Sequence, residues 1–147
     1  MSATVRDLLK TKGNNVWHIS PDINVLDALN LMAEKEVGAL LVVEDGKILG
    51  IVSERDFIRK IADKQFFAVD IPVHEYMTTR VLIVTPDNSI DDCMMLMTDK
   101  HIRHLPVVDQ GTLVGIISIG DLVKETISER DRTIVNLENY ITGRYTT

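Results

Sequence analysis

The chain has 147 residues, which is enough for one core or two small cores and too few for a catalytic domain joined to a regulatory one. Its net charge of −6 and its 5% aromatic content argue against nucleic-acid or anionic-membrane partners, because phosphates are repelled and bases find few rings to stack on. No apolar run reaches the roughly 18 residues of a membrane span and no signal-peptide core is present, so we expect a cytoplasmic protein.

The first half of the chain contains signals for two helices and a hairpin. Asn24-x-x-Asp27 is a capping box, and the apolar residues that follow it have helical spacing. The run "ALLVV" is joined to "ILGIVS" through the turn "EDGK", which predicts a β-hairpin. A second helix is expected to begin near Asp56.

The second half shows the same signals in the same order after the linker "ADKQFFAVDIP". Ser89-x-x-Asp92 opens a helix whose apolar stripe includes Cys93, which is the single cysteine and is expected in the core. The runs "LPVVD" and "LVGIIS" flank the turn "DQGT" and predict a second hairpin, and a further helix is expected near Asp121.

The two halves are a repeat. At an offset of 65 residues, the separation of Pro21 and Pro86, residues 16–61 align with residues 81–126 without a gap. We therefore predict a duplicated strand-helix-strand-strand-helix unit of the α/β (α+β) class, with the two sheets packed together about a pseudo-twofold axis. The predicted division is residues 1–67, 68–130 and 131–147, the last a helical extension whose apolar face is suited to an oligomer contact or to packing back on the module; that face carries Ile134, Leu137 and Ile141.

The closing motifs of the two hairpins can be interpreted in two ways. Ser53-x-x-Asp56 and Ser118-x-x-Asp121 are capping boxes that satisfy backbone N–H groups of a first helical turn. The same geometry also puts a hydroxyl, a carboxylate and free N–H groups at the end of a strand, where a phosphorylated ligand could be held.

With this layout the sequence resembles a tandem pair of CBS domains, the family named after cystathionine β-synthase. The resemblance rests on the "PD" that precedes each helix, on "LPVVD", and on "GIVSERD" and "GIISIGD". It implies an adenine-nucleotide sensor with two related clefts between the copies. In each cleft the Asp binds ribose hydroxyls and the Ser lies near the phosphate, roles that fall on Asp121 with Ser118 and on Asp56 with Ser53.

The resemblance also implies further ligand contacts. Arg103 and His104 would face the phosphates, and a planar guanidinium suits phosphate oxygens. The first copy has Gly38 and Ala39 at those positions, as walls of an adenine pocket. Gly120 is small where the other cleft has Arg55, which either blocks that cleft or adds a phosphate contact, so the Asp121 cleft is predicted to be the better formed. The remaining apolar lining, partly through backbone contacts to the base, is Val16, Ile51, Val81 and Ile116.

The sequence therefore predicts a regulatory module that binds AMP, ADP, ATP, NAD or S-adenosylmethionine, has no enzymatic activity, and forms a homodimer. The ligand would act by shifting the population of conformations. No metal is predicted, because His18, His74 and His101 lack metal-ligand spacing. One alternative is a structural dimerisation module with empty clefts, and another is a small enzyme that uses Asp121 and His104 as base and acid. Nucleic-acid binding is disfavoured by the acidic balance.

Overall fold

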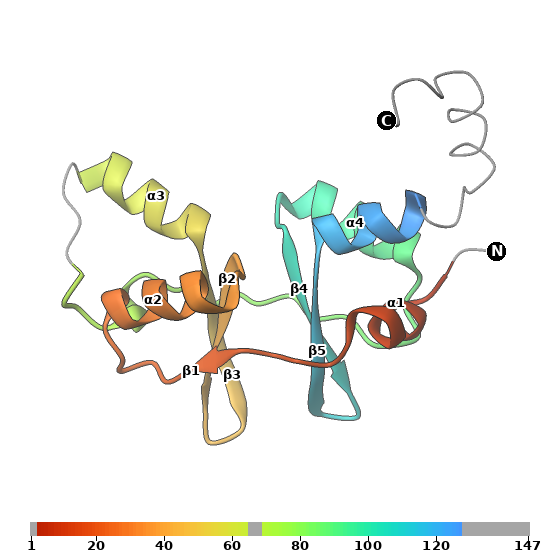
Figure 1. Ribbon diagram of the computed structural model, residues 1–147, viewed down its shortest axis with the longest axis horizontal. Coiled ribbons are helices and arrows are strands. Elements are labelled where there is room, and N and C mark those ends of the chain that lie inside the picture. The colour runs from red at the N-terminus through yellow and green to blue at the C-terminus, as the bar shows by residue number, and fades with distance from the viewer. Residues whose placement is uncertain (1–2, 65–68, 128–147) are drawn as a thin grey trace, which may run out of the picture. The chain divides into compact units, whose positions relative to one another are not determined.

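The structure, a computed structural model, describes residues 3–64 and 69–127 (Figure 1). They form two compact units. Unit 1 comprises the residues up to Asn14 together with those from Ile83 onward, and unit 2 comprises Asn15–Leu82. The chain therefore mixes helices and strands in an α+β arrangement with two sheets, as the sequence predicts.

Unit 2 contains a three-stranded sheet in the order β1-β2-β3. Strand β1 runs parallel to β2, and β2 and β3 form the predicted antiparallel hairpin (Figure 1). Its turn residues Asp45 and Gly46 have φ values of 52° and 76°, as a tight hairpin requires. The elements are β1 (His18–Ile19), α2 (Val25–Lys35), β2 (Ala39–Glu44), β3 (Lys47–Ser53), α3 (Glu54–Lys64) and the 3₁₀ turn η1 (Val73–Glu75).

Unit 1 contains the second predicted hairpin, β4-β5. The strand expected before α4 is reduced to one parallel bridge, between Val84 and Val107. The pairing stops there because Pro86 has no N–H and the Thr85 N–H turns to the Asn88 side chain at 2.7 Å. The elements are α1 (Val5–Lys12), α4 (Ile90–Lys100), β4 (His104–Asp109), β5 (Thr112–Ser118) and a helix over residues 119–127.

Each unit encloses its own apolar core. In unit 2, Leu40, Val42 and Val52 are fully buried. In unit 1, Leu105 and Ile117 are fully buried, together with the largely apolar stripe of α4. Cys93 belongs to that stripe and is 1% exposed, so the prediction of a core cysteine is confirmed. Burial raises the pKa of its thiol to about 11, which keeps it protonated and unreactive.

The segment that precedes each repeat packs with the other repeat. The N–H of Val5, in α1, donates to the Asn88 carbonyl at 2.9 Å within unit 1. The N–H of Val73, in η1, donates to the Ile23 carbonyl at 2.8 Å within unit 2. Periodicity along the chain did not anticipate this exchange, and the predicted division at residues 67 and 130 stays a prediction.

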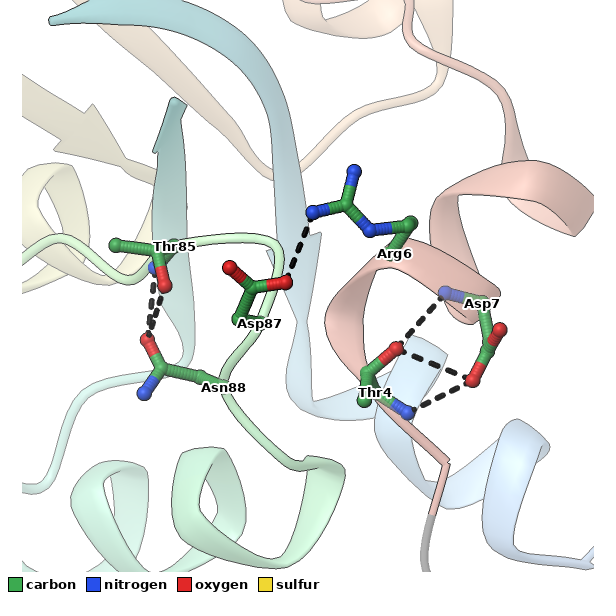
Figure 2. A network of polar contacts seen from close by, with 6 residues as sticks. All are labelled: Thr4, Arg6, Asp7, Thr85, Asp87 and Asn88. Carbon is green, nitrogen blue, oxygen red and sulfur yellow. Dashed lines mark hydrogen bonds and ion pairs between the residues drawn. The ribbon is translucent and has the colours of Figure 1, made fainter. Parts of the chain in front are cut away.

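Side chains fix the start of α1 within unit 1 (Figure 2). Thr4 and Asp7 form a reciprocal capping box, in which the Asp7 N–H donates to the Thr4 hydroxyl and the Thr4 N–H donates to Asp7 Oδ2. Arg6 donates to Asp87 Oδ1 at 2.8 Å. These contacts hold the first turn of α1 against the segment before α4.

The predicted oligomer or docking helix with Ile134, Leu137 and Ile141 lies outside the described residues. Within residues 3–64 and 69–127, no helix combines the length and the apolar character that a membrane crossing needs.

Candidate functional site

The Ser-x-x-Asp motif that ends β5 is a helix cap with one oxygen left over. The Ser118 N–H donates to Asp121 Oδ2 at 2.8 Å, and the Asp121 N–H donates back to the Ser118 hydroxyl at 3.2 Å. No hydrogen bond to Asp121 Oδ1 is seen within the part of the chain that the structure describes. The capping interpretation is therefore correct, and it leaves the second carboxylate oxygen able to accept a ligand hydroxyl.

Lys12, the last residue of α1, binds the same carboxylate. Its Nζ lies 2.6 Å from Asp121 Oδ2 and 2.6 Å from the Ile116 carbonyl oxygen. Both side chains are partly covered, with exposed fractions of 31% for Lys12 and 23% for Asp121. Burial alone raises the pKa of Asp121, but the Lys12 ammonium and the Ser118 N–H lower it by more, so the net pKa lies below the ordinary value.

The backbone of Ile116 faces the outer edge of β5. Ile116 is paired with Pro106, which has no N–H and whose carbonyl accepts the Val84 N–H at 3.0 Å on the far side of β4. Ile116 and Pro106 are therefore a non-hydrogen-bonded pair, and the N–H and C=O of Ile116 point away from β4. Among the described residues, the structure gives the C=O one partner, Lys12, and gives the N–H none.

Ser118 lies two residues further along the same edge, so its N–H points outward as well and meets Asp121. We call the group formed by Lys12, Ile116, Ser118 and Asp121 the Asp121 half-site. It combines a backbone donor, a backbone acceptor, a hydroxyl and a carboxylate. The Lys12 ammonium contacts two of these groups, the backbone acceptor and the carboxylate.

Unit 2 contains the matching Asp56 half-site, formed by Ile51, Ser53, Asp56 and Thr78. The cap is the same, since the Ser53 N–H and hydroxyl donate to Asp56 Oδ2 at 2.8 and 3.0 Å. The surroundings differ. The backbone of Thr78 pairs with both polar groups of Ile51, at 3.0 and 2.9 Å, and its hydroxyl lies 3.5 Å from Asp56 Oδ1.

Arg103, predicted to face the phosphate, and Gly38, predicted as a wall of the adenine pocket, occupy equivalent places just before β4 and β2. The Arg103 carbonyl accepts the Ile119 N–H at 2.9 Å, as the Gly38 carbonyl accepts the Glu54 N–H at 3.1 Å. The Arg103 side chain is exposed. His104 and Ala39 begin their strands, and His104 faces Ser118 across the hairpin.

The other predicted residues divide between the units. Val16 and Val81 are half-buried in unit 2, and Arg55 and Gly120 are exposed near the starts of their helices. Each unit thus brings together its own Ser, its own Asp and one strand isoleucine, Ile116 or Ile51. The predicted binding residues are therefore divided between the two units. Neither Lys12 nor Thr78 is predicted from the sequence as a member of these half-sites. The signal that could have found them is the difference between the two lead-in segments, since one is rich in lysine and the other has Thr78 and Thr79.

Within residues 3–64 and 69–127, no three histidine, cysteine, aspartate or glutamate side chains are grouped so that they could hold a metal ion. Comparison with known families gives two matches to the model of the CBS domain, over residues 5–63 and 73–128. The chain belongs to the CBS-domain family. The two matches confirm the predicted tandem pair of CBS repeats.

The CBS pair is similar along its whole length to known proteins. It is 36% identical over 154 residues to the mitochondrial CBS domain-containing protein CBSX3 of Arabidopsis thaliana, covering 98% of this chain and 74% of that one. A CBS-domain protein structure from Burkholderia ambifaria has a TM-score of 0.82 at 45% identity, with coverages of 88% and 97%. CBSX2 in complex with AMP has a TM-score of 0.72 at 26% identity, with coverages of 88% and 99%.

Proposed function

We propose that this CBS pair is a regulatory module that binds an adenosine-containing nucleotide at the Asp121 half-site. The observation that carries the proposal is the Asp121 carboxylate, which caps a helix with Oδ2 and has Oδ1 left to accept a hydrogen bond. The relative CBSX2, solved with AMP, supports an adenosyl ligand. AMP, ADP, ATP, NAD and S-adenosylmethionine share the half of the molecule that these groups would contact.

The chemistry of the half-site suits adenosine. A carboxylate accepts hydrogen bonds from ribose hydroxyls, and each charge-assisted bond contributes about 1.5–3 kcal/mol. The outward N–H and C=O of Ile116 offer a donor and an acceptor side by side, which complement the ring nitrogen and amino group of adenine. The exposed guanidinium of Arg103, at the start of β4, is the proposed phosphate contact.

The Asp121 half-site is the better candidate of the two. In the Asp56 half-site, both the N–H and the C=O of Ile51 are paired with the backbone of Thr78, whereas among the described residues only the C=O of Ile116 has a partner, the Lys12 side chain. We therefore propose that the Asp121 half-site binds ligand more tightly. Binding would regulate by favouring one conformation of the chain over another.

Thermal unfolding in the presence of each of the five adenosyl ligands tests the proposal. A ligand at 100 times its Kd stabilises the fold by about 2.7 kcal/mol. Asp121→Asn keeps an oxygen for the Ser118 N–H and replaces the other acceptor by an NH2 group, so it should fold and lose the ligand-induced shift. Asp92→Asn is the matched control, because Asp92 uses its backbone N–H to meet its Ser89 cap and should retain the shift.

If no adenosyl ligand changes the unfolding midpoint of the wild type, the nucleotide proposal is wrong. A structural dimerisation module is then the better explanation, because Ser53-Asp56 and Ser118-Asp121 both serve as helix caps and need no ligand to account for them. Large apolar side chains are exposed on α3, with Ile58 at 64%, and would be the dimer surface. Analytical ultracentrifugation of wild type and Ile58→Glu would test this. If Ile58→Glu is a monomer where the wild type is a dimer, and no adenosyl ligand changes either result, the structural module is favoured. Turnover of ATP or NAD that disappears in Asp121→Asn would instead support an enzyme using Asp121 and His104.

A further inference from the structure

The Lys12 ammonium contacts two of the protein groups that we propose bind the ligand. Its ammonium contacts the Ile116 carbonyl, the proposed acceptor for the base, and Asp121 Oδ2, which belongs to the proposed ribose-binding carboxylate. Both distances are 2.6 Å, short for hydrogen bonds of this type. The ammonium takes the place at the Ile116 carbonyl that an adenine amino group would take, and it neutralises the carboxylate whose other oxygen, Oδ1, would accept a ribose hydroxyl.

We infer that Lys12 is a built-in competitor for the Asp121 half-site, and that an adenosyl ligand binds there by displacing the Lys12 ammonium. The inference rests on the proposed function and adds to it the residue that sets affinity at that half-site. The displaced ammonium exchanges two protein contacts for water, so each binding event carries the cost of breaking an ion pair.

The position of Lys12 in α1 makes the displacement easy. Lys12 is the last residue of the helix, and Gly13 after it adopts a φ of 97°, which ends the helical path. The Lys12 side chain is 31% exposed, so solvent can receive the ammonium after a rotation of the side chain. Arg6 and the Thr4-Asp7 box hold the other end of α1 (Figure 2), so the helix need not detach.

The partners of Lys12 favour competition over an added phosphate contact. They are the base acceptor and the ribose carboxylate, while the proposed phosphate contact, Arg103, is a different residue. Within residues 3–64 and 69–127, the structure places no ammonium on Asp56, and Thr78 meets its carboxylate with a neutral hydroxyl at 3.5 Å. Competition by a cation is therefore specific to the Asp121 half-site.

Calorimetric titration of the full chain with adenosine and with AMP tests the inference. Lys12→Met keeps the aliphatic stem and removes the charge. Because a partly exposed ion pair contributes modestly, the Kd of both ligands should fall by about twofold to fivefold. The matched control is Lys10→Met, an exposed lysine of the same helix, which should leave both Kd values unchanged. Raising the salt concentration should narrow the difference in adenosine affinity between wild type and Lys12→Met, since salt weakens the ion pair.

A second readout follows the lysine itself. Acetylation with acetic anhydride, located by mass spectrometry, should label Lys12 more slowly than Lys10 in the free protein. Saturating AMP should speed the labelling of Lys12 and leave Lys10 unchanged. Thermal unfolding of Lys12→Met without ligand checks that the variant is folded.

The outcomes separate the inference from the proposed function. If Lys12→Met weakens the binding of AMP and leaves the binding of adenosine unchanged, Lys12 is a phosphate contact and the inference is wrong. The inference is also wrong if wild type and Lys12→Met bind the two ligands with equal affinity, or if AMP protects Lys12 from acetylation. In either case the proposed function still stands if Asp121→Asn loses ligand binding. If neither ligand binds wild type or Lys12→Met, the proposed function fails and the inference fails with it.

Discussion

At the scale of single residues, Asp121 shows how one carboxylate can serve a fold and a ligand together. Oδ2 accepts the Ser118 N–H and the Lys12 ammonium, and both partners stabilise the charged form. Asp56 accepts the same capping bonds but has the neutral Thr78 beside it. The two motifs are nearly alike in sequence, and their charge environments differ because of residues far away in the chain.

This difference predicts how stability depends on pH. The pKa of Asp121 is raised by burial and lowered by more through Lys12 and Ser118, so its folded-state pKa is depressed. Its contribution is therefore complete above the unfolded-state pKa of about 3.9 and is lost as pH falls through the lower folded-state value. At pH 6, Asp121→Asn should lower the free energy of unfolding by about 1 kcal/mol relative to wild type.

Urea unfolding of wild type and Asp121→Asn at pH 6 and pH 3 measures this effect. The difference between the two proteins should shrink at pH 3. Lys12→Met should show a smaller pH-dependent loss than wild type, because one cause of the depressed pKa is gone. A difference that stays constant between the two pH values would mean that the Asp121 charge does not stabilise the fold.

At the scale of elements, the two hairpins carry glycines that allow the lead-in segments to approach closely. A Cβ added to Gly50 would lie 2.7 Å from the Thr78 carbonyl oxygen, which is backbone and belongs to the bridge with Ile51. A Cβ added to Gly115 would lie 2.8 Å from Leu9 Cδ2, the end of a flexible side chain. The repeats therefore share the close approach and differ in what must move.

We predict that Gly50→Ala destabilises the protein more than Gly115→Ala. Overpacking typically costs about 1–3 kcal/mol, and the rigid Thr78 backbone puts Gly50→Ala near the upper end while Leu9 can rotate away from Gly115→Ala. Denaturant unfolding of the two variants gives both free energies. Equal losses would show that β3 and the Thr78 segment can separate as easily as a side chain rotates.

Which of these features the sequence predicts depends on how local their causes are. The turns at Asp45-Gly46 and Gln110-Gly111 and the cap at Ser118 arise within a few residues, so composition and spacing suffice. The family resemblance then added candidate roles. The contact between Lys12 and Asp121 joins residues 109 positions apart, and no local pattern encodes it.

At the scale of the whole molecule, the same reasoning explains the exchange of lead-in segments. Periodicity assigns α1 to the first repeat, because it precedes that repeat in the chain. In space α1 completes unit 1, and η1 completes unit 2 by equivalent backbone bonds. A duplicated sequence is compatible with either pairing, since each lead-in segment resembles the other. The exchange places Lys12 next to Asp121, so the proposed competition depends on it.

Two matched substitutions test the exchange. Val5 and Val73 begin α1 and η1 and are both fully buried, so truncating either to alanine should cost about 2 kcal/mol. Hydrogen exchange of backbone amides under native conditions then reports which sheet is loosened. Val5→Ala should speed exchange in β4 and β5 more than in β2 and β3, and Val73→Ala should do the reverse. If Val5→Ala instead loosens β2 and β3, α1 belongs to the first repeat after all, and Lys12 could not hold Asp121.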